Sequence, residues 1–262
     1  MKCCICGTVR DCGKYLDNIF SIMEKIGSLF EEYTIILYYD KSNDNTLEKI
    51  TDYSKKNDKL NYIVNSEEML KYRTHRIARG RNKCLNFMND NYPDYEYFIM
   101  MDCDDRCSYN IRLNLLKNYL VRKDWDALSF NHPEYYYDSW ALSIRPYVLS
   151  CHHFNDYSSG QKYITERIKR TPRHKLIRCL SAFNGFSIYR REKFTNCWYD
   201  GKFRLDYWSP KYIKQNIDVS GKIVFKDDNL KNEDCEHRFF HVSAVKKHNA
   251  RIMISPLCLF YK

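Results

Sequence analysis

One stretch of the sequence restricts the fold more than any other: residues 95–105, YEYFIMMDCDD. A mainly aromatic and apolar run ends there in three carboxylates, Asp102, Asp104 and Asp105. Such a run predicts a buried strand that delivers its last side chains into a crevice. Residues i and i+2 of an extended segment share a face, so Asp102 and Asp104 point the same way. Two carboxylates together suit Mg²⁺ or Mn²⁺ as ligands. The alternative interpretation of these acids is an ordinary polar turn after a strand.

The length and composition predict one folded domain without a membrane span. The chain has 262 residues, of which 44% are hydrophobic and 16% aromatic, too much apolar surface for a disordered chain. The first ten residues are too poor in apolar side chains for a signal peptide, and no apolar run reaches about 18 residues. We therefore expect a cytoplasmic protein whose 12 cysteines are reduced and mostly buried.

The net charge of +10 predicts an anionic partner: nucleic acid, an anionic membrane or a phosphorylated small molecule. The basic residues are mostly spread along the chain, which argues against a dedicated nucleic-acid surface. The exception is residues 167–178, RIKRTPRHKLIR. This cluster is interpreted either as part of a phosphate or membrane site or as an ordinary solvated face.

Strands and helices alternate along the first half of the chain. The expected elements are strands at residues 2–9, 33–39, 60–64 and 125–130, and helices at residues 11–29, from 46 onward and 111–121. This alternation predicts an α/β fold with a parallel sheet and right-handed crossovers. Residues 150–180 are expected to be an irregular excursion over the sheet edge.

Residues 39–46, YDKSNDNT, combine a strand end, an Asp-x-Ser-x-Asp-x-Thr turn and a helix start. This arrangement resembles the opening of nucleotide-sugar glycosyltransferases of the GT-A fold, which have a Rossmann-like, mostly parallel central sheet flanked by helices. The resemblance implies a single GT-A domain over residues 1–262, with a nucleotide-binding half at 1–107 and an acceptor-binding half at 108–262. It also implies that Thr8, Arg10 and Asp40 contact the nucleotide.

A basic segment precedes the acidic strand end. Arg79, Arg81 and Asn82 are interpreted as the opening of a helix that holds a pyrophosphate through its side chains and its N-terminal backbone donors. Many GT-A enzymes carry a similar segment at this place. The alternative is a helical turn with ordinary surface arginines.

By the same resemblance, Asp102-Cys103-Asp104 matches the Asp-x-Asp motif of these transferases. The motif implies that Asp104 contacts the metal, with Asp102 on the ribose or on metal-bound water, while a one-residue shift would give Asp105 either role. Asn184 and Gly185 would face the donor sugar, unless they form a simple Asn-Gly turn. The aromatic loop at residues 135–140 suits a sugar ring.

A second acidic group lies near the end of the chain, at Glu233 and Asp234. It resembles the Glu-Asp pair that binds the acceptor hydroxyl in GT-A enzymes, which implies a catalytic role, whereas acids at a helix start are also favoured by the helix dipole alone. His237 shares a helix face with Asp234 and is a candidate third metal ligand or phosphate partner. Residues 136–140 and 250–256 give a narrower resemblance to fungal capsule-associated mannosyltransferases.

The favoured function is a metal-dependent glycosyltransferase, with Mn²⁺ or Mg²⁺, that moves a sugar from a UDP- or GDP-sugar to a hydroxyl of a glycan or glycoprotein. One alternative is a sugar-phosphate nucleotidyltransferase, for which Gly7–Arg10 is a poor glycine-rich loop. The other is a basic module that binds nucleic acid or membrane without catalysis, which leaves both acidic clusters unused. We expect no nucleic-acid partner, while the charge leaves a peripheral membrane contact open.

Overall fold

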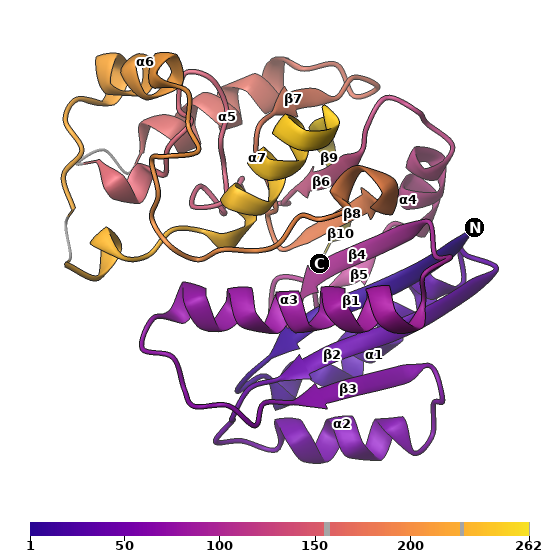
Figure 1. The fold of residues 1–262 in the computed structure, drawn as a ribbon. Helices are drawn as coiled ribbons and strands as arrows, with labels where there is room; N and C mark the ends of the chain where they lie inside the picture. Colours follow the sequence, from indigo (N-terminus) through magenta and orange to yellow (C-terminus); the bar gives the residue numbers. More distant parts are fainter. Residues whose placement is uncertain (155–157, 226–227, 262) are drawn as a thin grey trace.

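The computed structural model describes residues 1–154, 158–225 and 228–261. It is an α/β structure in which helices cover both faces of one eight-stranded sheet (Figure 1). The strands of this sheet are β1 (Lys2–Val9), β2 (Glu32–Tyr39), β3 (Leu60–Val64), β4 (Tyr97–Asp102), β6 (Ala127–Asn131), β7 (Ile177–Cys179), β8 (Phe186–Arg190) and β9 (Ile252–Cys258). The α-helices are α1 (Gly13–Gly27), α2 (Thr46–Ser54), α3 (Arg73–Asn91), α4 (Leu113–Leu120), α5 (Ser159–Arg170), α6 (Pro210–Ser220) and α7 (Glu236–His248).

The strand order β3-β2-β1-β4-β8-β6-β9-β7 explains where a ligand can bind. The first four strands are parallel, and β8 runs antiparallel between β4 and β6. The carboxyl ends of β1, β2 and β4 therefore meet at one edge, where Thr8 lies opposite both Tyr38 and Asp102. A short separate sheet pairs β5 (Asn110–Ile111) with β10 (Phe260–Tyr261). The expected GT-A type of α/β fold, with a mostly parallel sheet, is confirmed.

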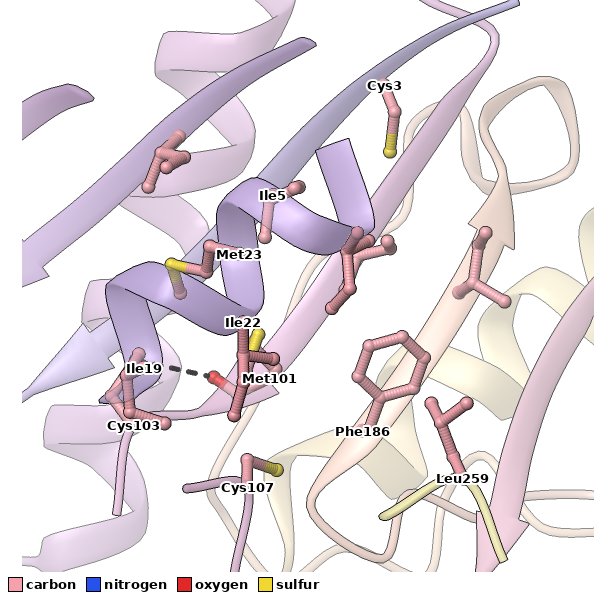
Figure 2. Packing of buried hydrophobic residues seen from close by; sticks show 14 of the residues in the cluster. Cys3, Ile5, Ile19, Ile22, Met23, Met101, Cys103, Cys107, Phe186 and Leu259 are labelled. Atoms are coloured by element: carbon pink, nitrogen blue, oxygen red, sulfur yellow. Dashed lines mark hydrogen bonds between the residues drawn. The ribbon is translucent and has the colours of Figure 1, made fainter. Parts of the chain in front are cut away.

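Alternation along β1 divides the core into two layers. Cys3 and Ile5 point toward α1, which packs Ile19, Ile22 and Met23 against the sheet (Figure 2). Cys4 and Cys6 face the opposite layer, which contains side chains of α3 and α7. The cysteines behave as the small hydrophobes that their positions predict, since 11 of the 12 are buried and all 12 are free.

Two sequence predictions about this framework are wrong. Residues 150–180 are not an irregular excursion, because they contain α5 and β7; residues 155–157 of that range lie outside the described residues. The basic segment at Arg79 does not open a helix either, because α3 already begins at Arg73. None of the helices in the described part of the chain is both long and apolar enough to span a bilayer.

Candidate active site

A cleft of about 710 Å³ opens at the carboxyl ends of β1 and β4. Its walls come from the first turns of α3, the start of α7 and the loop after β6. Charged side chains dominate the lining, with five arginines and six carboxylates: Arg10, Arg73, Arg76, Arg81 and Arg106, and Asp11, Asp40, Asp102, Asp104, Asp138 and Glu236. A cleft with both signs of charge at this edge of an α/β sheet is the expected place for a phosphorylated ligand.

Asp102 and Asp104 both line this cleft, as the sequence predicts. Asp102 ends β4 and accepts a hydrogen bond from Arg81 Nη2 at 3.0 Å, while Asp104 Oδ1 accepts one from the backbone N–H of Arg106 at 3.0 Å. Burial raises the pKa of both carboxyl groups, and the neighbouring Asp104 raises that of Asp102 further. Ionisation of both groups is thus disfavoured unless further positive charge is placed beside them. The next carboxylate, Asp105, is 52% exposed and lies 3.8 Å from Arg106 Nε.

The two carboxylates fit a hard divalent cation that is shared with a substrate. Within the described ranges of the chain, no group of three or more His, Cys, Asp and Glu side chains is arranged to hold a metal ion. Mg²⁺ and similar ions often bind through one or two carboxylates and complete their shell with phosphate oxygens and water. The donor set of Asp102 and Asp104 has this chemistry, so a nucleotide would have to complete the site.

Arg81 connects the end of β4 to the start of α7. Its guanidinium is buried, with Nη1 2.5 Å from Glu236 Oε1 and Nη2 bound to Asp102. Nη1 also contacts Nε2 of His237, whose ring stacks on Phe183 at a centroid distance of 3.7 Å. Burial, followed by the charge of Arg81, holds the pKa of His237 well below its usual range. His237 therefore lines the cleft as a neutral partner of Arg81, and its role as a third metal ligand stays a prediction.

Neither Asp234 nor Glu233 lines the cleft. Asp234 is 2% exposed and accepts hydrogen bonds from Arg238 Nε at 2.9 and 3.1 Å. Glu233 Oε2 accepts hydrogen bonds from the backbone N–H and the hydroxyl of Thr74, each at 3.0 Å. Each acid is engaged by another partner, and the catalytic role expected for them stays a prediction. The carboxylate that this segment contributes to the cleft wall is Glu236.

Asn184 and Gly185 support the cleft floor and lie behind the lining residues. Asn184 Oδ1 accepts hydrogen bonds from the backbone N–H groups of Tyr137 and Asp138, at 3.2 and 3.0 Å. The carbonyl of Gly185 accepts one from the N–H of Asp102 at 2.8 Å. Both residues have positive φ, as the predicted Asn-Gly turn requires. These hydrogen bonds hold the aromatic loop and the end of β4, and a contact of Asn184 and Gly185 with the donor sugar stays a prediction.

The residues expected to contact the nucleotide divide into two groups. Thr8, Arg10 and Asp40 line the cleft, with Arg10 Nη1 3.7 Å from Asp40 Oδ2. Arg79 turns away and donates to the carbonyl of Glu68 at 2.8 Å. The side chain of Asn82 bonds both the N–H and the carbonyl of Tyr199, at 2.8 Å each, so it anchors a loop.

Two arginines of the cleft, Arg73 and Arg76, were missed by the sequence reasoning. Both lie in the first turn of α3, and Arg76 Nε is 4.0 Å from Asp40 Oδ2. A sequence signal for one of them exists, because Arg73, Ile77 and Arg81 are spaced four residues apart and so share a helix face. The signal was hidden because the helix start was placed too late.

Comparison with known proteins identifies the family. Residues 13–198 match Glycosyl transferase family 2. The chain belongs to this family. It therefore carries a glycosyltransferase domain, which agrees with the GT-A arrangement of sheet and cleft. No curated protein matches the chain.

Solved structures show the same fold at low sequence identity. A crystal structure of S. aureus TarS 1-349 has a TM-score of 0.51 at 14% identity, and its complex with UDP-GlcNAc has a TM-score of 0.50 at 15% identity. All of this chain is covered in both comparisons, but only 60% and 58% of those chains. The chain thus spans less than two thirds of the TarS chains that it resembles. The narrower resemblance to fungal capsule-associated mannosyltransferases stays a prediction.

Proposed function

We propose that this glycosyltransferase moves a sugar from a UDP- or GDP-sugar to a hydroxyl of a glycan or glycoprotein, and that it needs Mn²⁺ or Mg²⁺ at Asp102 and Asp104. The observation that carries the proposal is the position of these two carboxylates at the end of β4, in one cleft with five arginines. The family match supports sugar transfer over the two alternatives, a nucleotidyltransferase and a binding module. The TarS complex with UDP-GlcNAc supports a nucleotide-sugar as the donor.

The donor would lie across the edge of the sheet. Arg10 and Asp40, beside the ends of β1 and β2, would contact the nucleoside, since they are the polar groups at that end of the cleft. Arg73 and Arg76 would place fixed positive charge near the diphosphate, where negative charge develops as the sugar leaves. A bound divalent cation would supply further neutralisation of the leaving diphosphate.

The acceptor hydroxyl would approach from the start of α7, and we assign its contact to Glu236. Glu236 is the carboxylate of this segment in the cleft wall, and its ion pair with Arg81 keeps it oriented. Asp234 is the alternative; both acids are held in buried ion pairs, but only Glu236 lines the cleft. Glu233 would keep its contact with Thr74 and hold the segment in place.

The decisive experiment measures thermal stabilisation by UDP- and GDP-sugars with and without Mn²⁺. Ligand at 100 times its Kd stabilises a protein by about 2.7 kcal/mol, or roughly 5–10 °C for a chain of this size. Asp104→Ala should abolish the metal-dependent part of this shift. Asp105→Ala is the matched control, because it removes a neighbouring carboxylate that is 52% exposed, and it should keep the shift.

Turnover assays then separate the candidate reactions. Release of UDP or GDP from a nucleotide-sugar, increased by a glycan acceptor, supports the transferase. Formation of a nucleotide-sugar from nucleoside triphosphate and sugar phosphate would instead support the nucleotidyltransferase. A chain that gives no shift with any nucleotide-sugar in the presence of Mn²⁺ would contradict the proposal.

A further inference from the structure

The basic cluster of the sequence is more concentrated than the chain-wide distribution suggests. Residues 158–180, which contain α5 and β7, include seven Lys and Arg residues and a single acidic residue, Glu166. All seven basic side chains are exposed. This segment therefore carries six of the ten net positive charges of the chain, and none of its residues lines the candidate active site. The active site does not account for this charge.

The local structure leaves most of this charge available. Lys169 Nζ lies 3.0 Å from Glu166 Oε1, and Arg170, with a side chain that is 83% exposed, lies 3.9 Å from Glu166 Oε2. Among the described residues, no carboxylate is within ion-pair distance of Arg173, Lys175 or Arg178. Unneutralised cations on one segment raise the free energy of the isolated protein slightly, and an anionic surface would relieve this.

Apolar side chains are exposed on a neighbouring segment. Ile217, Val219 and Val224, in and after α6, are 37%, 45% and 47% exposed. α5 and α6 both pack on residues 145–149: the rings of Tyr147 and Tyr163 are 5.4 Å apart, and Asn216 Oδ1 accepts the N–H of Leu149 at 2.7 Å. α5 and α6 thus belong to one region of the molecule, and both lie in the upper part of Figure 1.

We propose that residues 158–180, together with the exposed apolar residues of 217–224, form a docking surface for an anionic lipid bilayer. Charge attracts this surface to acidic headgroups, and the apolar side chains enter the boundary between headgroups and acyl chains. Stable peripheral binding needs two such contributions, and this region supplies both. Nucleic acid would use the cations but would gain nothing from Ile217, Val219 and Val224. The bilayer is therefore the partner that the surface fits.

The test is co-sedimentation of the full chain with vesicles of phosphatidylcholine alone or with 30% phosphatidylserine. We expect binding to the anionic vesicles that weakens as salt rises. The variant Arg170→Gln/Arg173→Gln/Lys175→Gln should bind them roughly 100-fold more weakly. The matched control Lys55→Gln/Lys56→Gln/Lys59→Gln removes the same charge around the end of α2, away from α5 in Figure 1, and should change binding by less than about 3-fold.

A second variant separates lipid from other polyanions. Ile217→Ser/Val219→Ser should weaken vesicle binding by roughly 10-fold and leave binding to a DNA duplex unchanged. An equal loss of vesicle binding in the Arg170/Arg173/Lys175 variant and in the Lys55/Lys56/Lys59 control would overturn the proposal, because net charge alone would then explain binding. Tighter binding to the duplex than to anionic vesicles, or vesicle binding that the serine variant leaves unchanged, would also overturn it. Circular dichroism and thermal midpoints confirm that these surface variants are folded.

Discussion

Asp234 and Arg238 form an ion pair that is buried on both sides, with Arg238 Nε 2.9 Å from Asp234 Oδ2 and side chains that are 3% and 0% exposed. The guanidinium also donates to the carbonyl oxygens of Leu142 and Val148, at 2.8 and 3.1 Å, and to that of Trp140. The pair thus holds residues 140–148, which continue the aromatic loop of the cleft, against the start of α7. Asp234, which the resemblance suggested for catalysis, thus takes part in a buried ion pair that connects two segments.

Replacing Asp234 is therefore expected to reduce stability first. Asp234→Ala leaves Arg238 charged and buried without its partner, which costs about 3–5 kcal/mol of unfolding free energy. Glu236→Gln is the matched comparison, because it keeps the shape of a side chain that lies in the cleft. It should lower turnover by at least about 10²-fold if it removes a contact made at the reacting hydroxyl, with a smaller loss of stability.

Urea denaturation and sugar-transfer rates, measured on both variants, distinguish the two roles. A stable Asp234→Ala protein without activity, beside an active Glu236→Gln protein, would return the acceptor role to Asp234.

Arg73 should contribute more to donor binding than Arg79, although only Arg79 was singled out from the sequence. Arg73 lines the cleft, while Arg79 binds the carbonyl of Glu68 outside it. Loss of a charged hydrogen bond to a phosphate costs about 1.5–3 kcal/mol, so Arg73→Gln should weaken nucleotide-sugar binding by roughly 10- to 100-fold. Arg79→Gln, on the same helix, should change it by less than about 3-fold. Isothermal titration with a UDP- or GDP-sugar and Mn²⁺ measures both, and equal effects would argue against the assignment.

Gly185 should not tolerate a side chain. Its φ is +86°, and an added Cβ would lie 2.4 Å from Tyr137 Oη. Gly221 has a similar φ of +80° with no atom within 4 Å of its added Cβ, so Gly221→Ala isolates the backbone strain. Gly185→Ala should cost at least about 1 kcal/mol more than Gly221→Ala in unfolding free energy. It should also weaken the Mn²⁺-dependent thermal shift, since the Gly185 carbonyl positions Asp102.

A pH-dependent part of the stability is expected from Asp126, which is 2% exposed. Burial alone would raise the pKa of Asp126, but hydrogen bonds from the N–H, Nε and Nη2 of Arg251, at 2.8, 2.9 and 2.9 Å, hold it below its usual value. A lowered folded-state pKa adds stability above about pH 4, and this stability is lost as the pH falls through the folded-state pKa.

At pH 7, Asp126→Asn should cost about 1–3 kcal/mol, and the difference from the wild type should shrink as the pH falls toward 3. Asp124→Asn, which breaks the exposed pair with Arg122, should cost less than about 1 kcal/mol throughout. Denaturation curves between pH 3 and pH 7 provide the test, and a difference for Asp126→Asn that is independent of pH would contradict it.

Local sequence patterns were sufficient to predict the central part of the fold. The apolar run before Asp102 and the turn after Tyr39 each place a strand end by composition alone, and parallel strands bring those ends to one edge of the sheet. The position of Asp102 and Asp104 in the cleft follows from this geometry, while Thr8, Arg10 and Asp40 were assigned to it through the resemblance to GT-A enzymes.

The remainder depends on contacts between distant segments, which local patterns do not contain. The start of α3 was missed because the N-cap residue, Tyr72, makes no capping side-chain bond, and Glu233, 159 residues away from Thr74, accepts the Thr74 N–H. The ion pair of Asp234 with Arg238 was not predicted, because an acid near a helix start looks the same in the sequence whether it faces a ligand or a buried arginine. The four-residue spacing of Asp234 and Arg238 was the sequence signal for this ion pair.

The hydrogen bonds from Thr74 to Glu233 also affect how this enzyme can be engineered. The segment 232–236 holds the first turn of α3 through Thr74 and, two turns further along, holds Arg81 through Glu236. A chimaera that combined residues 1–107 of this chain with a second half lacking these two acids would leave an unsatisfied helix start and would remove one of the two carboxylates that pair with the buried Arg81 guanidinium. New specificities are therefore more readily obtained by exchanging the cleft's loops than by exchanging its halves.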